Sequence, residues 1–146
     1  MQSMIDSFRK TLKAAHGKYS ETLEKLRKLE AIPVALRTPK LCLEYVKRNG
    51  RELGSVQEAL KTAELCAIAV RESAWAFEFV PDKFKTPELC MEAVTGDDME
   101  SMLAFVPEEL KTLELCVAAV EHWGFDDPYR YIPEHLREQV KEIFQV

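Results

Sequence analysis

The sequence lacks the apolar segments that membrane-spanning and exported proteins carry. No apolar run approaches the roughly 18 residues needed to span a bilayer, and Met1 to Lys13 contain no apolar signal-peptide core. No stretch shows the residue pattern of a β-strand. These absences predict an all-α cytoplasmic protein with no membrane partner.

Recognisable catalytic and metal-binding motifs are missing as well. The chain has no G-x-S-x-G or H-E-x-x-H motif, no glycine-rich phosphate loop and no C-x-x-C pair. Its three histidines, His16, His122 and His135, are widely separated. We therefore expect a protein that is not an enzyme, that has no catalytic residues or metal site, and that needs no cofactor.

What the chain does contain is one short segment repeated along its length. The clearest copy is VPDKFKTPELCMEAV, which begins at Val80. Other copies begin at Ile32, Val56, Val106 and, in degenerate form, Ile132. The cysteines keep one place in the repeat, at intervals of 24, 24 and 26 residues: Cys42, Cys66, Cys90 and Cys116. Such a period is typical of a solenoid, in which each unit buries its apolar face against its neighbours.

Local signals predict a long helix, a shorter helix and a tight turn in each unit. A threonine suited to the N-cap precedes each long helix: Thr38, Thr62, Thr86 and Thr112. The apolar stripe that follows, Leu89, Cys90, Ala93 and Val94 in the third copy, is one face of a helix of about ten residues. Glycines at the helix ends are expected to adopt left-handed conformations: Gly50, Gly96 and Gly124.

The N-terminal residues follow a different pattern. From Ile5 to Leu29 apolar residues alternate at steps of three and four, as in a coiled coil, with Gly17 as an interruption. One bent helix and a hairpin of two helices both fit this pattern. We expect residues 1–31 to cap the first repeat or to associate with a second chain through residues 1–30, and residues 32–146 to form a stack of about four repeats with a degenerate C-terminal cap.

The consensus V-P-x-x-L-K-T-x-E-L-C-x-x-A-V resembles the short α-helical repeats of the family called domain of unknown function 4116. Such repeats occur in tandem in bacterial, protist and giant-virus proteins. The first copy departs from the pattern at Lys40, where the later copies have glutamate, and residues 1–30 lie outside it. The resemblance implies an all-α repeat fold and carries no activity to this chain.

One basic residue recurs at the same place in all five copies: Arg37, Lys61, Lys85, Lys111 and Arg137. Stacking of the units would align these residues as a ridge that binds phosphate or nucleic acid. The alternative is that each cation pairs locally with the acidic N-terminus of the next helix.

A second repeated place is aromatic. Phe79, Phe105 and Tyr131 each precede the Val or Ile that opens a copy. Together with Trp75 and Trp123, they either lie between layers of helices or form an exposed surface that binds a partner.

The chain is acidic, and its charge is unevenly distributed. The formal net charge is −5, yet residues 1–30 contain seven Lys or Arg against four Asp or Glu, which leaves −8 on the rest. An acidic body favours a cationic protein partner and argues against nonspecific binding of nucleic acid. Four acidic residues near the C-terminus are candidates for partner binding: Asp97, Asp98, Asp126 and Asp127.

These patterns lead to a functional hypothesis and an alternative. The first is a non-enzymatic protein–protein interaction module, and a small acidic bacterial protein of this kind is suited to inhibit a basic toxin or nuclease as an immunity or antitoxin-like protein. The alternative is binding of phosphate or nucleic acid along the basic ridge. The cysteines enter neither hypothesis, because we expect all four to be reduced and buried.

Overall fold

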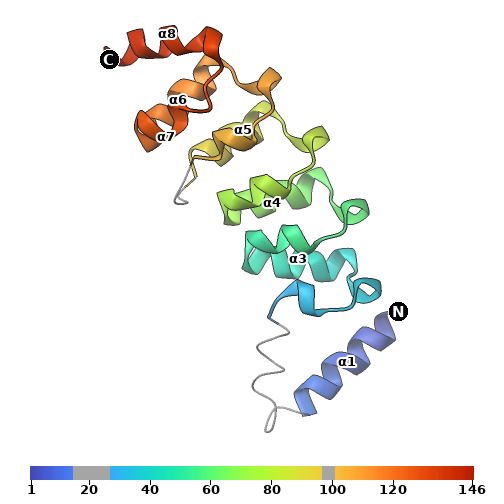
Figure 1. The fold of residues 1–146 in the computed structure, drawn as a ribbon. Helices are drawn as coiled ribbons and strands as arrows, with labels where there is room; N and C mark the ends of the chain where they lie inside the picture. The colour runs from blue at the N-terminus through green and yellow to red at the C-terminus, as the bar shows by residue number, and fades with distance from the viewer. Residues whose placement is uncertain (15–26, 97–100) are drawn as a thin grey trace.

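The computed structural model describes residues 1–14, 27–96 and 101–146, and these ranges contain no β-strand. The all-α class predicted from the sequence is confirmed. The helices form a row of units, with α1 (Gln2–Ala14) at one end and α8 (Glu134–Phe144) at the other (Figure 1).

Each unit consists of a long α-helix, a short helix and a single 3₁₀ turn. The long helices are α3 (Pro39–Arg48), α4 (Ala63–Glu72), α5 (Pro87–Val94) and α6 (Leu113–Trp123). The short helices are η3 (Gly50–Ser55), η5 (Ala74–Phe79), η7 (Met102–Phe105) and, in the last unit, α7 (Asp126–Tyr129). The turns are η2 (Val34–Leu36), η4 (Glu58–Leu60), η6 (Asp82–Phe84) and η8 (Glu108–Leu110).

The long helices begin where the sequence predicts, because a threonine caps each one. The hydroxyl oxygens of Thr38, Thr62, Thr86 and Thr112 accept hydrogen bonds from the backbone N–H three residues later, at 3.3, 3.1, 3.2 and 3.2 Å. Pro39 and Pro87 occupy the first helical position, where the missing N–H costs no intrahelical bond.

Three of the four predicted short helices are 3₁₀ rather than α-helical. A 3₁₀ helix has three residues per turn, so every third side chain lies on one line. Ala74, Phe77 and Val80 are all buried in this way, and so are Leu53 and Val56 one unit earlier. The tighter helix thus directs a complete row of side chains into the core.

Only one of the three glycines has a positive φ, and its ψ of 177° is extended and not that of a left-handed helical turn. Gly124, which ends α6, has φ 83°, whereas Gly50 and Gly96 do not have positive φ, so the prediction of a left-handed turn was wrong for all three. Gly50 and Gly96 are positions of close approach instead. A Cβ on Gly96 would lie 2.5 Å from the Cβ of Ala74, and one on Gly50 would overlap the carbonyl oxygen of Ala69.

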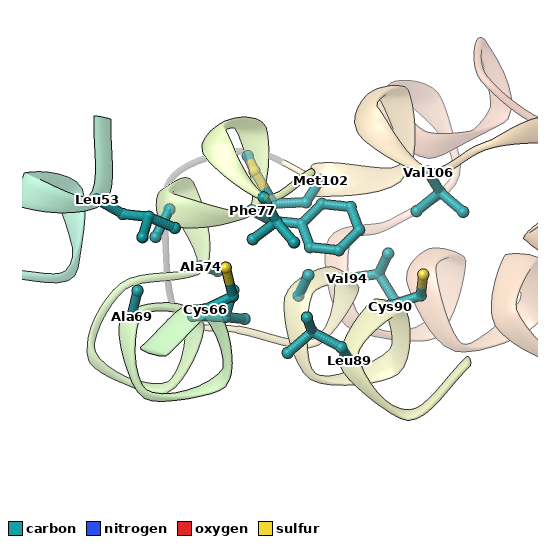
Figure 2. Packing of buried hydrophobic residues seen from close by; sticks show 14 of the residues in the cluster. Leu53, Cys66, Ala69, Ala74, Phe77, Leu89, Cys90, Val94, Met102 and Val106 are labelled. Carbon is teal, nitrogen blue, oxygen red and sulfur yellow. The ribbon is translucent and has the colours of Figure 1, made fainter. Parts of the chain in front are cut away.

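Successive units pack directly against each other. Helix α3 contacts α4, α4 contacts α5, and α5 contacts α6, while the short helices η3, η5 and η7 contact one another in the same order. One continuous cluster of buried residues runs through the row from Leu29 to Val140. Figure 2 shows its middle part, where Phe77 lies beside Met102 with Cys66 and Cys90 on either side.

Helix α1 covers the first unit only in part. Ile5 is buried, whereas Phe8 and Met4 are 38% and 60% exposed. Arg9 forms an ion pair with Glu44 of α3 at 3.1 Å, which ties α1 to the first unit. Gly17, where an interruption was predicted, lies outside the described residues.

The expected N-terminal helix does not extend to Leu29. Residues 29–31 form the 3₁₀ turn η1 (Leu29–Ala31), and Leu29 has no exposed surface. Leu29 and Ile32 keep the spacing of Leu53 and Val56, so η1 has the place that a short helix has in the later units. Among the described residues, the continuous buried cluster therefore begins three residues before the repeat pattern becomes visible in the sequence.

Candidate functional site

The repeated lysines lie inside the stack and do not form a ridge on its surface. The side chains of Lys61, Lys85 and Lys111 are only 5%, 8% and 7% exposed. Each ammonium pairs with the carboxylate three residues earlier, at 2.5, 3.0 and 2.7 Å: Glu58, Asp82 and Glu108. The acidic partner thus belongs to the same turn and not to the next helix. These three lysines leave little ammonium surface for a phosphate or nucleic acid.

The same basic column joins the turn before each long helix to the short helix after it. Three of its members donate to a backbone carbonyl oxygen at the end of that short helix, at 2.8, 2.9 and 2.8 Å: Arg37 to Ser55, Lys61 to Phe79 and Lys85 to Phe105. Each acceptor is the last residue of a short helix, where carbonyl groups lack a partner within the helix. Arg137, in the last copy, donates to the carbonyl oxygen of Ile132 at 3.1 Å.

The aromatic column is neither fully buried nor an open patch. Phe79 is 37% exposed, and Phe105 and Tyr131 are half-buried. The ring of Phe79 lies over Gly54 of the preceding unit, where a Cβ would be 3.1 Å from it. Each aromatic ring therefore keeps part of its surface exposed to solvent.

Trp75 and Trp123, the two tryptophans that the sequence offered as candidates for partner binding, are half-buried. Trp123 donates from Nε1 to the carbonyl oxygen of Val94 at 2.7 Å, so it joins α6 to the end of α5. The guanidinium of Arg51 lies 5.4 Å from the ring centre of Trp75. Both rings contribute to contacts between units and leave only part of their area on the surface.

Of the four candidate aspartates, Asp127 has a role within the fold. Its Oδ2 accepts a hydrogen bond of 3.2 Å from the N–H of Ser101, at the start of η7 in the preceding unit. Glu52 does the same in the first unit, accepting from the N–H of Leu29 at 2.6 Å. Asp126 is exposed to solvent. Asp97 and Asp98 lie outside the described residues.

The four cysteines are free and have no exposed surface. Burial raises the pKa of Cys66, Cys90 and Cys116 from 9.0 to about 11, and it raises the pKa of Cys42 as well. The positive charge of the neighbouring lysine lowers the pKa of these three thiols, but this effect is smaller than that of burial. The lysines are Lys61 beside Cys66, Lys85 beside Cys90 and Lys111 beside Cys116. Protonated, enclosed thiols are poor nucleophiles.

We predict that the native thiols resist alkylation. At about pH 8, iodoacetamide should modify Cys66, Cys90 and Cys116 roughly 100-fold more slowly in the folded protein than in urea, because a pKa raised by two units lowers the thiolate fraction by that factor. The folded-state rate should rise as the pH approaches 11. Mass spectrometry of timed samples measures the alkylation rate of each cysteine. Fast labelling of one cysteine, with an unchanged circular dichroism spectrum, would contradict the prediction and would show that the thiol is accessible to solvent in the folded protein.

A groove lies between α5 and α6, beside the turn η8, and Leu115 of the buried stripe is part of its lining. Its volume is about 480 Å³, and its apolar lining includes Met91 and Leu110. Three carboxylates stand around it, on Glu88, Glu92 and Glu114, and no Lys or Arg lines it. We call this the α5/α6 groove.

An equivalent groove between α3 and α4 differs in charge. It has a volume of about 290 Å³ and is lined by residues at the same repeat positions. Lys40 stands where the α5/α6 groove has Glu88, Leu43 replaces Met91, and Glu64 corresponds to Glu114. The shape of the groove recurs along the row, but its acidic character does not.

The long helices show the same trend. Helices α4, α5 and α6 together carry six glutamates and one arginine, whereas α3 carries three Lys or Arg and one glutamate. All six glutamates are exposed: Glu64, Glu72, Glu88, Glu92, Glu114 and Glu121. Arg71 reaches Glu92 at 3.6 Å in an exposed ion pair, which is weak. We call the outer surface of these three helices the acidic face.

The groove residues were not identified from the sequence. A glutamate in the first turn of a helix already suits the helix dipole, so Glu88 and Glu114 needed no further explanation. One feature of the sequence could have pointed to the groove. The charge at one repeat position differs between copies, with Lys40 in the first and Glu88 in the third.

Within the described ranges, no three His, Cys, Asp or Glu side chains are grouped closely enough to hold a metal ion. No helix in the described parts of the chain combines the length and apolar character needed to cross a bilayer. Comparisons with protein-family models, with curated proteins and with solved structures find no match to this chain.

Proposed function

We propose that this chain is a non-enzymatic protein-binding module whose partner is a cationic protein. The acidic face of α4, α5 and α6 carries the proposal, because its six exposed glutamates are opposed by a single arginine that is already paired. Complementary charge across an interface speeds association and disfavours wrong partners.

Two other features support a binding function over a catalytic one. The thiols are buried with raised pKa values, and the repeated lysines are occupied by carboxylates and carbonyl oxygens inside the stack. What remains on the outside of the long helices is a repeated surface of carboxylates and half-buried apolar groups. An immunity or antitoxin-like inhibitor that covers a basic toxin or nuclease fits this class of partner.

The test is affinity capture from a lysate of the source cell on immobilised protein. Wild type should retain a cationic protein at low salt and release it near 1 M salt, where the Debye length falls to about 3 Å. The variant Glu64→Gln/Glu88→Gln/Glu114→Gln should retain at least about five-fold less, since three exposed charge pairs are removed.

A second variant controls for net charge. Glu109→Gln/Glu134→Gln/Glu142→Gln removes three exposed carboxylates outside the acidic face and should retain as much as wild type. If folded wild type retains no cationic protein, or if both variants lose retention equally, the proposal fails.

A further inference from the structure

The α5/α6 groove combines an apolar lining with carboxylates on both sides, and we propose that it is the docking site for a basic segment of the partner. In such a segment, lysine or arginine side chains flank one aliphatic side chain that enters the groove near Met91 and Leu110. The inference rests on the proposed function and adds the place of binding and the chemistry of the bound segment.

The carboxylates are placed to hold a chain laid along the groove. Glu88 and Glu92 are four residues apart on α5, so they stand one above the other on the same face of the helix. Glu114 lies in the first turn of α6, on the other side of the groove. Cations that alternate in direction along a bound segment would therefore meet a carboxylate on either side.

The apolar lining supplies what charge alone does not. Met91 and Leu110 are partly buried, pack against the core and line the groove. An aliphatic side chain placed there is removed from water, and the unbranched thioether of Met91 adapts to different shapes. A volume of about 480 Å³ lies within the range of pockets that enclose small ligands, so it accommodates a few side chains.

Charge selects this groove over its equivalent in the first units. The α3/α4 groove has Lys40 in the place of Glu88, whereas beside each groove one glutamate forms an exposed ion pair, Glu44 with Arg9 at 3.1 Å and Glu92 with Arg71 at 3.6 Å. A cationic segment therefore has a favourable site between α5 and α6 and a mixed-charge site between α3 and α4. One bound segment per chain is the expected stoichiometry.

The experiment uses the full chain and a fluorescein-labelled peptide of lysine, leucine and glycine, with binding followed by fluorescence anisotropy at low salt. One control peptide has serine in place of leucine, and another has glutamate in place of lysine. Wild type should bind the lysine–leucine peptide at one site and bind the glutamate peptide at least about ten-fold more weakly. Binding of the serine peptide as tight as that of the leucine peptide would overturn the inference.

Variants locate the site. Glu88→Gln/Glu92→Gln/Glu114→Gln should weaken peptide binding about ten-fold, because three exposed charge pairs are lost. Met91→Gln should weaken it about five-fold, whereas Leu43→Gln, at the same place in the α3/α4 groove, should change it less than two-fold. Glu109→Gln/Glu134→Gln/Glu142→Gln is the charge-matched control and should also change it less than two-fold. Equal effects of groove and control variants would overturn the inference.

Two results separate this inference from the proposed function. If wild type captures a cationic protein but the groove variants bind peptide and partner as wild type does, only the docking site is wrong. If wild type captures no cationic protein, the proposed function fails as well. Salt-sensitive self-association that the groove variants abolish would assign the groove to a second copy of this chain and would overturn the inference.

Discussion

Replacing Phe77 by alanine is expected to lower the free energy of unfolding by about 3–5 kcal/mol. The side chain is completely buried, and its helix η5 contacts η3 of the preceding unit and both η7 and α5 of the following one. The ammonium of Lys85 also lies 4.9 Å from the centre of the ring. Truncation therefore leaves a cavity where three units meet (Figure 2). Urea unfolding followed by circular dichroism measures the loss.

The control lies two residues further on in the same short helix. Phe79 is 37% exposed, so Phe79→Ala removes the same atoms from a site that is already partly in water. We expect this variant to lose only about 1 kcal/mol. Equal losses for the two variants would show that Phe77 does not lie at the centre of the packing.

Gly50→Ala is expected to destabilise the protein by roughly 3 kcal/mol or more, at the upper end of the cost of overpacking. The added Cβ would overlap the carbonyl oxygen of Ala69 and lie 2.9 Å from the backbone nitrogen of Ser73. Both atoms belong to the backbone at the end of α4 in the next unit, so the clash is relieved only if two units move apart. The thermal midpoint and the urea midpoint should both fall.

Gly54→Ala is the matched control. There the nearest atoms belong to the ring of Phe79, 3.1 Å away, and a partly exposed side chain can shift. We expect its free energy of unfolding to stay within about 1 kcal/mol of wild type. A wild-type midpoint for Gly50→Ala would contradict the close contact between the first two units.

Local chemistry explains why much of the fold was predictable. A threonine that caps a helix, a proline in the first turn and an apolar stripe act within a few residues, so Thr86, Pro87 and Leu89 place the start of α5 whatever surrounds it. The burial of the cysteines followed from their place on that stripe. The 3₁₀ form of η5 was less predictable, because its burial at every third residue becomes visible only when Ala74, Phe77 and Val80 are seen in contact with neighbouring units.

The candidate site was predictable only in its net charge. A repeated residue aligns with its copies, but its direction depends on how each unit is rotated against the next. Lys61 and Lys85 were candidates for a surface ridge and instead donate to carbonyl groups at the ends of the short helices η5 and η7. Met91 and Glu92 had no assigned role and line the α5/α6 groove.

By itself, the sequence determined the helical class, the number of units, the starts of the long helices and the acidic balance of the chain, because these depend on short-range chemistry and on composition. Only the tertiary structure decided which repeated side chains face solvent, where Gly50 and Gly96 allow close contact, and which groove is acidic. These properties depend on the distance and rotation between neighbouring units, and no single repeat contains that information.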